Sequence, residues 1–319
     1  MLTPTESSLQ ARKAIALRSI EMMATGTADV FAEVTHRDFF NHEQHDEPPA
    51  TRGPGPEAAF GVARWLRAAY ADLRWDIHDV VAEGDLVAVR CTMSGRHTGD
   101  FVAYDVEGRV AEAFPPTRRR FTSSQSHWLR IRDGQAVEHW AQRDDYGMAH
   151  QLGWVPPTPG YLVRCALAKR RARRAADPPR RAQERPFAPW GGELTPVKAA
   201  ALRAVDASSL DDGLREVERV VHHVAAEGDL VAVHATVTGE HVAAVAVRDA
   251  DGGLDRVLPP TGRRFSVQET RWVRLDEARR AVEHWTDRDD LGMAQQLGWA
   301  PPSLRYLARM AVAKRQARG

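Results

Sequence analysis

The chain contains two diverged copies of one sequence pattern, and this duplication constrains the fold more than any other feature. Three segments of the first copy recur in the second at an offset of 144 or 145 residues. They are VAEGDLVAV at 81–89 and AAEGDLVAV at 225–233, PPTRRRF at 115–121 and PPTGRRF at 259–265, and VEHWAQRDDYGMAHQLGWVPP at 137–157 and VEHWTDRDDLGMAQQLGWAPP at 282–302. Because the offset hardly changes over roughly 90 residues, the sequence predicts a tandem repeat of one domain.

The two copies are unequal at their N-terminal ends. The first has roughly 80 residues ahead of its EGD turn, and the apolar spacing of Ala14, Leu17, Ile20 and Met23 predicts a helix there. The second follows a stretch rich in arginine and proline and lacks a counterpart of residues 10–50. The predicted organisation is a complete domain at 1–157, a basic helix and Pro/Arg-rich linker at 158–193, and an N-terminally truncated domain at 194–319.

The bulk composition excludes several classes of protein. A length of 319 residues, 43% hydrophobic and 27% charged residues and a net charge of +1 are typical of a soluble globular protein without affinity for nucleic acid or membrane. Cys91 and Cys165 are the two cysteines, so neither a disulfide framework nor a zinc site is expected. The polar N-terminus does not resemble a signal peptide, and no stretch of about 18 apolar residues is present. We therefore expect a cytoplasmic protein without metal or cofactor.

Each copy shows helical patterns followed by strand patterns. Residues 56–71 form an amphipathic pattern with Trp65 on the apolar face. Strand patterns follow at 73–82, 85–96, 119–132 and 135–144, and a short helix then ends at Gly153. The RDGQ turn predicts that the last two strands form an antiparallel hairpin. Helices gathered on one side of a mostly antiparallel sheet define an α+β fold.

The order of these motifs resembles that of the SnoaL-like polyketide cyclases, members of the nuclear transport factor 2-like superfamily. The segments that carry the resemblance are GPGPE with its following helix, ADLRWDIHDVVAEGDLVAVR, GRHTG, PPTRRR, and IRDGQAVEHW with DDYGMAHQLG. The resemblance implies two tandem cone-shaped domains, in each of which a curved, mostly antiparallel sheet and helices on its concave side enclose an apolar pocket. It also implies dimerisation through the outer face of the sheet, and ring closure by intramolecular aldol chemistry without metal or cofactor.

The resemblance further implies a Gln-x-His pair on one hairpin strand and an aspartate fourteen residues after the histidine. Gln125 and His127 match the pair and are the predicted catalytic residues. Ala141 stands where the aspartate is implied, so the expected carboxylate is missing. In the second copy, the same three positions carry Glu269, Arg271 and Thr286. The retained pair favours an enzyme, whereas Ala141 favours a degenerate pocket.

Strand alternation predicts which side chains of the hairpin face the pocket. If Gln125 and His127 point inward, His139 and Arg143 also point inward from the partner strand. The hairpin tryptophans then point outward in both copies, and they are Trp128, Trp140, Trp272 and Trp285. Because such large aromatic side chains should not be left in water, we expect the two sheets to pack face to face as an intramolecular pseudo-dimer.

The predicted substrate contacts combine polar and apolar side chains. They are His42, His97, His139, Arg143, Trp65 and Leu129. His42 follows the N-terminal helices, where the resemblance implies a pocket-lining residue. His97 lies at a strand end, where it is equally a candidate for a turn-stabilising hydrogen bond. His139 recurs as His284 beside a tryptophan, which also fits a purely structural role.

Other polar groups have a structural and a functional interpretation. Asp144 and Asp145 precede the terminal helix, as an N-cap or as a replacement for the missing carboxylate. In the second copy, Glu269 and Arg271 lie on one inward face, and their pairing would fill the pocket. We therefore predict little or no cavity in that copy. The basic segment 164–185 is either a solvated linker or a site for an anionic partner.

Together these observations favour a cofactor-independent cyclase, or a related lyase or isomerase, acting on a polyketide-type small molecule in secondary metabolism. The active pocket is expected in the first copy, which alone has the N-terminal helices and the Gln125/His127 pair. Without a carboxylate partner to raise its pKa, His127 should be mostly neutral near pH 7. The alternative is a non-catalytic small-molecule-binding or scaffold protein with a degenerate pocket.

Overall fold

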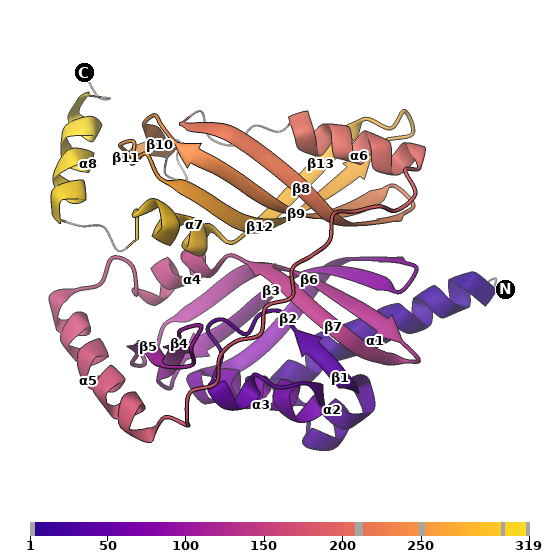
Figure 1. Ribbon diagram of the computed structural model, residues 1–319, viewed down its shortest axis with the longest axis horizontal. Helices are drawn as coiled ribbons and strands as arrows, with labels where there is room; N and C mark the ends of the chain where they lie inside the picture. Colours follow the sequence, from indigo (N-terminus) through magenta and orange to yellow (C-terminus); the bar gives the residue numbers. More distant parts are fainter. Residues whose placement is uncertain (1–3, 208–212, 249–252, 301–303, 317–319) are drawn as a thin grey trace. The chain divides into compact units, whose positions relative to one another are not determined.

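The computed structural model describes residues 4–207, 213–248, 253–300 and 304–316. The chain forms two compact units (Figure 1). The first extends to Phe187 and includes Ala225–Gly228, and the second comprises the remaining residues from Ala188. Each unit is an α+β domain with a curved sheet, which confirms the predicted fold class of two tandem domains. The face-to-face packing of the two sheets, and the place of the tryptophans in it, stay predictions.

The first unit is built on a five-stranded sheet in the order β1-β7-β6-β3-β2. These strands are β1 (Thr35–Asn41), β2 (Tyr70–Glu83), β3 (Leu86–His97), β6 (Arg120–Arg132) and β7 (Gln135–Arg143). A separate hairpin consists of β4 (Phe101–Tyr104) and β5 (Val110–Phe114). All pairs are antiparallel except β1 with β7, which is parallel. The four strand patterns of the sequence correspond to β2, β3, β6 and β7.

The helices of the first unit cover the concave side of this sheet and one of its ends. They are α1 (Pro4–Thr25), α2 (Ala28–Val34), the short η1 (Pro49–Thr51), α3 (Gly55–Ala69), α4 (Asp145–Leu152) and α5 (Pro159–Ala175). Ala16 and Ile20 of α1 are buried against Val87, Val89 and Leu129 of the sheet. Burial of this apolar face, rather than helix propensity alone, holds α1 on the sheet.

The β6–β7 hairpin sets the register of the candidate site. Its turn residues Asp133 and Gly134 both have positive φ, 48° and 76°, as a two-residue turn of type I′ requires. The turn pairs His127 with Ala141, and every second residue of each strand then faces the concave side. The tryptophan pair Trp128–Trp140 lies on the opposite face, with ring centroids 6.0 Å apart. The alternation predicted from the sequence is therefore confirmed.

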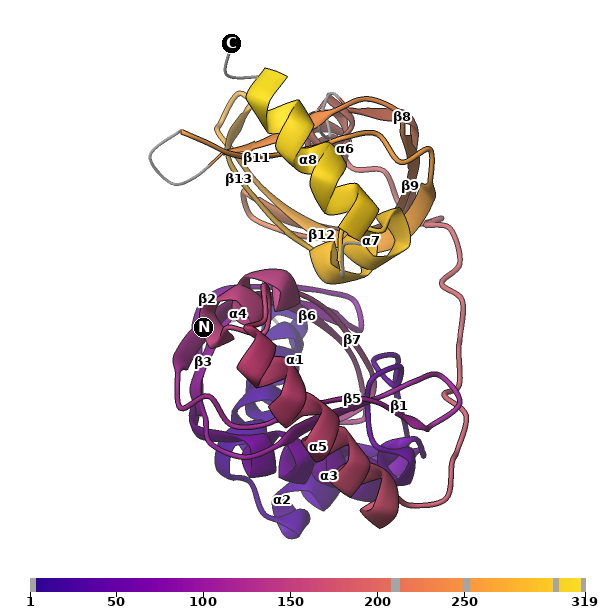
Figure 2. The same cartoon turned by 90° about the vertical axis from the view of Figure 1, so that its left-hand side faces the viewer.

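The second unit repeats the strands but has fewer elements around them. Its sheet has the order β13-β12-β9-β8, and the two units share the arrangement of a terminal helix beside a separate hairpin (Figure 2). Its elements are α6 (Pro196–Ala207), β8 (Leu214–Glu227), β9 (Leu230–His241), β10 (Val245–Arg248), β11 (Leu254–Leu258), β12 (Arg264–Leu275), β13 (Ala281–Arg288), α7 (Asp290–Leu297) and α8 (Leu304–Gln316). Within the described ranges, this unit has no strand paired to β13 on the side that β1 occupies in the first unit. The predicted loss of a counterpart of residues 10–50 agrees with this topology.

The terminal helices are attached in the same way in both units. The hydroxyl of Tyr161 in α5 donates to the carbonyl of Pro115 at 2.9 Å, and the hydroxyl of Tyr306 in α8 donates to that of Pro259 at 2.9 Å. Lys169 also pairs with Glu112 of β5 at 3.0 Å. The helix that begins the basic segment is therefore packed onto its domain through one face.

An N-cap explains why α4 begins where it does. The Asp144 side chain accepts a hydrogen bond from the backbone N–H of Gly147 at 2.7 Å, and Asp289 does the same for Gly292 at 2.7 Å. The structural interpretation of Asp144 is thereby confirmed in both copies. Asp145 begins α4 itself, and its carboxylate pairs with Arg143 at 3.3 Å.

Removing this cap is expected to have a modest effect on stability. We expect Asp144→Ala to lower the free energy of unfolding of the first unit by about 1 kcal/mol, because one helix N–H loses its acceptor. Asp144→Asn should change it by about half that or less, since an asparagine oxygen caps nearly as well. Urea denaturation of the three proteins measures both differences. Equal losses in the two variants would contradict the capping role and point to the charge instead.

Buried Arg52 joins three segments that are distant in the sequence. Its side chain is 0% exposed, and its guanidinium donates to backbone carbonyls at 2.8–3.2 Å. The acceptors belong to His45, Glu47, Asp105, Val106 and Arg180. This side chain therefore ties the loop after β1 to the β4–β5 hairpin and to the segment that leaves the domain.

That departing segment, residues 176–187, packs against the first unit as an extended strap. The backbone N–H of Ala182 donates to Val106 at 2.8 Å, and that of Gln183 donates to the Gln44 side chain at 3.1 Å. The Arg185 guanidinium lies 3.8 Å from the centre of the Phe40 ring. The boundary between the two compact units therefore lies after Phe187, inside the stretch 158–193 that the sequence assigns to helix and linker.

Candidate active site

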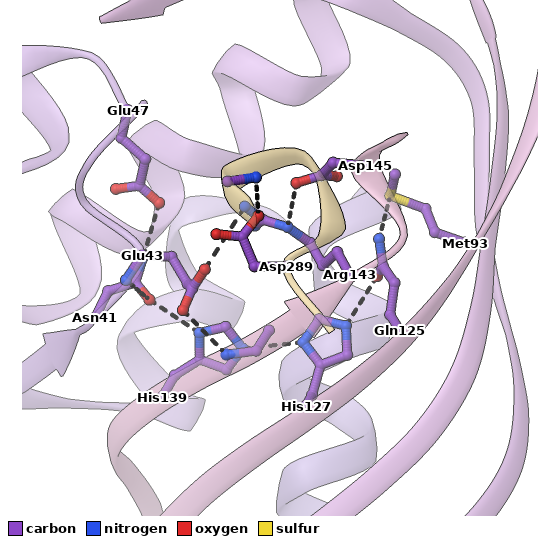
Figure 3. A network of polar contacts seen from close by, with 12 residues as sticks. Asn41, Glu43, Glu47, Met93, Gln125, His127, His139, Arg143, Asp145 and Asp289 are labelled. Carbon is purple, nitrogen blue, oxygen red and sulfur yellow. Dashed lines mark hydrogen bonds and ion pairs between the residues drawn. The ribbon is translucent and has the colours of Figure 1, made fainter. Parts of the chain in front are cut away.

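A hydrogen-bonded triad of Trp75, Gln125 and His127 occupies the concave face of the first unit. The Trp75 indole N–H donates to Gln125 Oε1 at 3.0 Å, and the same oxygen lies 2.9 Å from His127 Nε2. The amide nitrogen of Gln125 lies 3.5 Å from the sulfur of Met93 (Figure 3). The two predicted catalytic residues are thus brought together, and Trp75 fixes the orientation of the amide between them.

The triad continues through a second histidine to a buried carboxyl group. His127 Nδ1 lies 3.0 Å from His139 Nε2, and His139 Nδ1 lies 2.9 Å from Asn41 Oδ1. The Asn41 amide nitrogen lies 2.7 Å from Glu47 Oε1 (Figure 3). Glu47 is 3% exposed, so the chain runs from a partly accessible histidine pair into the protein interior. β1, β6 and β7 each supply a member of this chain.

A different carboxylate stands beside position 141. The backbone N–H of Ala141 donates to Glu43 Oε1 at 3.1 Å, and Glu43 Oε2 lies 3.6 Å from Arg143. This is possible because β1 ends at Asn41, which leaves the β7 edge open to the Glu43 side chain. The small side chain of Ala141 faces the same side as His127. A carboxylate from the loop after β1 therefore lies near the position where the family resemblance implies an aspartate.

The side chains around Arg143 are accessible yet deeply surrounded by protein. Arg143, Glu43 and Asp145 keep 28%, 20% and 28% of their side-chain surface exposed. Burial nevertheless raises the pKa of Glu43, against the opposing effect of Arg143. Burial likewise raises the pKa of Asp46. Two carboxyl groups with raised pKa values therefore lie near Arg143.

The histidine pair is neutral at physiological pH. Burial, with a smaller contribution from Arg143, lowers the pKa of His127 to about 3. Burial and the neighbouring His127 and Arg143 lower the pKa of His139 well below its usual value. Glu47 shows the opposite direction, because burial and the nearby Asp46 raise its pKa well above the usual value. The expected neutrality of His127 is in agreement with this, although burial rather than a missing carboxylate is the main cause.

His42 lies on the other face of the sheet from the histidine pair. Its Nε2 lies 2.8 Å from Glu138 Oε1, and its ring stacks on Phe187 of the strap with centroids 4.4 Å apart. Burial alone would raise the pKa of Glu138, but hydrogen bonds with His42 and Arg130 lower it to about 2. The structure thus does not bring His42 together with Gln125 and His127. Asn41, its neighbour in the chain, takes the concave position instead.

The remaining predicted contacts divide between the site and the core. Arg143 and His139 lie at the site, as described above. Leu129 is 2% exposed and packs under α1. Trp65 packs on Phe101, with centroids 4.8 Å apart, and donates its indole N–H to the Val102 carbonyl at 3.0 Å.

His97 has the environment of a turn-stabilising residue. It is 0% exposed and lies 3.3 Å from the Thr117 hydroxyl, and His241 of the second unit has the same relation to Thr261 at 3.2 Å. Burial lowers the pKa of His97 to about 4. An arrangement kept in both units, away from the histidine pair, favours the structural interpretation of this residue.

In the second unit, an ion-paired triad occupies the positions of Trp75, Gln125 and His127. The Arg219 and Arg271 side chains each donate through Nε to Glu269 Oε1 at 2.9 Å. Glu269 is 0% exposed, and its two partners are 9% and 10% exposed at their side chains. The predicted Glu269–Arg271 pair is confirmed, and Arg219 completes it. The predicted lack of a cavity stays a prediction that this internal ion pairing supports.

Sequence reasoning missed Trp75, Asn41, Glu43 and Glu47. The last three lie in FFNHEQHDE at 39–47, in which His42 is the one predicted contact. In the structure, Phe39 of β1 belongs to the concave core with Leu129, and Asn41 lies two residues later on the same face. His42 then falls on the outer side. No comparable signal places Glu43 and Glu47, which lie beyond the end of the strand.

Comparison with known proteins identifies the fold and the repeat together. The model of the SnoaL-like polyketide cyclase family matches residues 13–152 and again residues 207–297. The chain belongs to this family. Both repeats are SnoaL-like segments, and the chain is a tandem SnoaL-like cyclase.

Each of the following relatives matches less than half of this SnoaL-like chain. An aklanonic acid methyl ester cyclase of Streptomyces peucetius is 32% identical over 144 residues, which are 44% of this chain and 90% of the relative. A nogalonic acid methyl ester cyclase of Streptomyces nogalater is 31% identical over 130 residues, 40% of this chain and 87% of the relative. The crystal structure of IdmH from Streptomyces antibioticus shares 29% identity, with a TM-score of 0.34, over 44% of this chain and 98% of its own.

Within the part of the SnoaL-like chain that the structure describes, no cluster of three or more His, Cys, Asp or Glu side chains has the geometry to hold a metal ion. Among the described helices, none is long and apolar enough to cross a membrane.

Proposed function

We propose that the first repeat closes a ring in a polyketide-derived keto ester by an intramolecular aldol reaction, without metal or cofactor. The observation that carries the proposal is the Gln125–His127–His139 set on the concave face of the complete repeat. The relatives named as methyl ester cyclases support the reaction class and the kind of substrate. The second repeat is proposed to stabilise the first rather than to bind substrate.

The chemistry needs one base and one stabiliser of negative charge. A proton leaves the carbon beside a carbonyl group, the resulting enolate carbon attacks a ketone carbon of the same molecule, and the new alkoxide oxygen takes up a proton. Atoms and electrons balance without an oxidant, so the product is an isomer of the substrate. Glu43 is the proposed base, because its raised pKa brings a carboxylate closer to the basicity that carbon acids require.

The histidine pair supplies the second requirement. All four ring nitrogens of the pair are held in hydrogen bonds to Gln125, to Asn41 and between the rings, and the pair lies on the same face as the Glu43 carboxylate. Fixed polar groups of this kind stabilise an enolate because they need little reorganisation during the reaction. Arg143 pairs with Glu43 and Asp145 and is proposed to hold the base in place.

The test uses the two esters named in the relatives. The full chain is incubated with aklanonic and nogalonic acid methyl esters in the presence of a chelator, and products are separated by liquid chromatography with mass detection. We expect a new compound of unchanged mass from at least one ester, formed in proportion to enzyme concentration. Saturable binding of both esters with no isomer formed would contradict the proposal and favour the binding-protein alternative.

A further inference from the structure

We propose that Glu47, acting through Asn41, holds a single mobile proton for the His127–His139 pair. The catalytic use of this proton rests on the proposed function, but its existence follows from the hydrogen bonds alone. The relay comprises Glu47, Asn41, His139, His127 and Gln125 (Figure 3). Glu47 is a positioning residue in this proposal, since the histidine pair and not Glu47 faces the reacting molecule.

The Trp75 end of the relay fixes the direction of the first bonds. An indole N–H only donates, so the Gln125 oxygen that it contacts at 3.0 Å is an acceptor. The contact of that oxygen with His127 Nε2 therefore requires a proton on Nε2. A neutral His127 then has an unprotonated Nδ1, which must accept from the Nε2–H of His139. Both rings of a neutral pair thus carry the proton on Nε2.

The Glu47 end decides where one further proton resides. If Glu47 is ionised, the Asn41 amide donates to it and turns its oxygen toward His139 Nδ1, which then needs a proton as well. His139 would be an imidazolium. If Glu47 is protonated, it donates to the Asn41 oxygen, and the turned amide donates to a neutral His139. The hydrogen bonds along the relay are satisfied in both states, whereas the long contact of 3.4 Å from the Glu43 backbone N–H to the Asn41 oxygen is made only when Glu47 is ionised. The two states contain the same number of protons and differ only in whether the mobile proton is on Glu47 or on His139.

The surroundings favour the state with the proton on Glu47. The titratable and charged groups that act on the relay are Glu43 and Asp46 from the segment after β1, His42 from the other face of the sheet, Arg143 from β7, and Asp145 from α4. Burial raises the pKa of Glu47 and lowers that of both histidines, so a neutral carboxyl group and neutral rings coexist at rest. The resting relay therefore carries no net charge.

Catalysis would draw on the other state. As the base removes a proton from the substrate, negative charge develops on the substrate oxygen near the histidine pair. A shift of the relay proton from Glu47 to His139, with a turn of the Asn41 amide, makes the pair cationic at that moment. The carboxylate left behind lies at the far end of the relay. The shift reverses once the new alkoxide is protonated, so the relay is unchanged after each turnover.

The experiment measures the ring nitrogens of both histidines by ¹⁵N NMR in the full-length protein without substrate. In the wild type, we expect both rings to carry the Nε2 proton at neutral pH. We also expect one titration, above the usual pKa range of a carboxyl group, that changes both rings together as Glu47 loses its proton. In Glu47→Gln this titration should be absent, because a glutamine amide satisfies Asn41 but holds no titratable proton.

Controls separate the relay from general effects of charge. Glu33→Gln removes a carboxylate whose side chain is 63% exposed and paired with Arg18, and it should leave the titration unchanged. An unchanged titration in Glu47→Gln, or two rings that titrate independently, would overturn the proposal. If the esters are turned over, kcat of Glu47→Gln should fall about 10- to 100-fold with little change in KM. Absence of turnover in the wild type would refute the proposed function and leave the NMR result to decide the relay.

Discussion

Replacement of His127 by alanine is expected to reduce kcat at least about 100-fold while the protein remains folded. His127 connects Gln125 to His139, so its removal interrupts the polar set at its centre. Gln125 keeps its contacts with Trp75 and Met93, and the residues that pack α1 on the sheet are untouched. The measurement combines steady-state kinetics on the esters with urea denaturation, which should show a loss of about 1–3 kcal/mol at most.

The second repeat provides the matched control for a histidine on this hairpin. His284 is the counterpart of His139, and it is exposed. We expect His139→Ala to lower kcat to a similar extent as His127→Ala, and His284→Ala to leave it within about twofold of wild type, a difference of under 0.5 kcal/mol in barrier. Equal losses from all three substitutions would show that the effect is structural. Undiminished turnover in His127→Ala would remove the histidine pair from the mechanism.

The low pKa of His127 also predicts the form of the pH profile. Because burial lowers this pKa to about 3, His127 stays neutral from pH 5 upward, and its own titration cannot produce a loss of activity there. The free energy of unfolding changes with pH in the direction expected for any histidine that is buried in its neutral form. The unfolded chain binds a proton below its ordinary pKa near 6.5 and the folded chain does not, so stability falls as the pH drops from about 6.5 toward 3.

The largest loss of stability is expected from Arg52→Met. The substitution removes one donor from each of five backbone carbonyls in a buried region, of which those of Asp105 and Val106 keep a second donor in the backbone N–H groups of Gly108 and Ala182. Unsatisfied buried acceptors are costly, and we expect the free energy of unfolding of the first unit to fall by about 3–5 kcal/mol. Since Arg52 also holds the carbonyl of Glu47, kcat should fall as well. Urea denaturation monitored by tryptophan fluorescence measures the first effect.

Arg37 provides the control for the loss of an arginine. Its side chain is 87% exposed, so Arg37→Met should change the free energy of unfolding by no more than about 0.5 kcal/mol. The second unit contains none of the Arg52 acceptors, and its unfolding should be the same in all three proteins. A loss below about 1 kcal/mol in Arg52→Met would mean that water replaces the guanidinium at these carbonyls.

The sequence predicted most of the scaffold because the relevant signals are local or repeated. The RDGQ turn alone sets the hairpin register that places Gln125 and His127 on one face and Trp128 and Trp140 on the other. The duplication revealed that the second copy lacks its N-terminal elements. It also showed that inward positions diverge between the copies, as the Arg219–Glu269–Arg271 triad bears out.

The part of the site that the sequence did not reveal depends on β1. This strand pairs with β7 about a hundred residues later, and neither strand contains a local sequence motif that indicates the pairing. Alternation gives no clear signal in β1, because Phe39 is buried in the concave core and Phe40 is covered from the other side by Arg185. A strand with both faces covered has no polar face to reveal its parity. His42, which follows the end of this strand, therefore lies away from Gln125 and His127, and Asn41 takes the concave position that the sequence does not reveal.

The strap from 176 to 187 has a consequence for how the two halves can be separated or exchanged. Tandem repeats are usually modular, and a tether between them can be lengthened or replaced with little effect on either module. Here the first module uses part of its tether as structure, since Arg180 supplies a carbonyl to Arg52 and Phe187 covers His42. A flexible Gly/Ser replacement of this stretch would therefore remove pieces of the first domain. Any independent first module must extend through Phe187, and recombination between related chains preserves it only when the crossover lies beyond that residue.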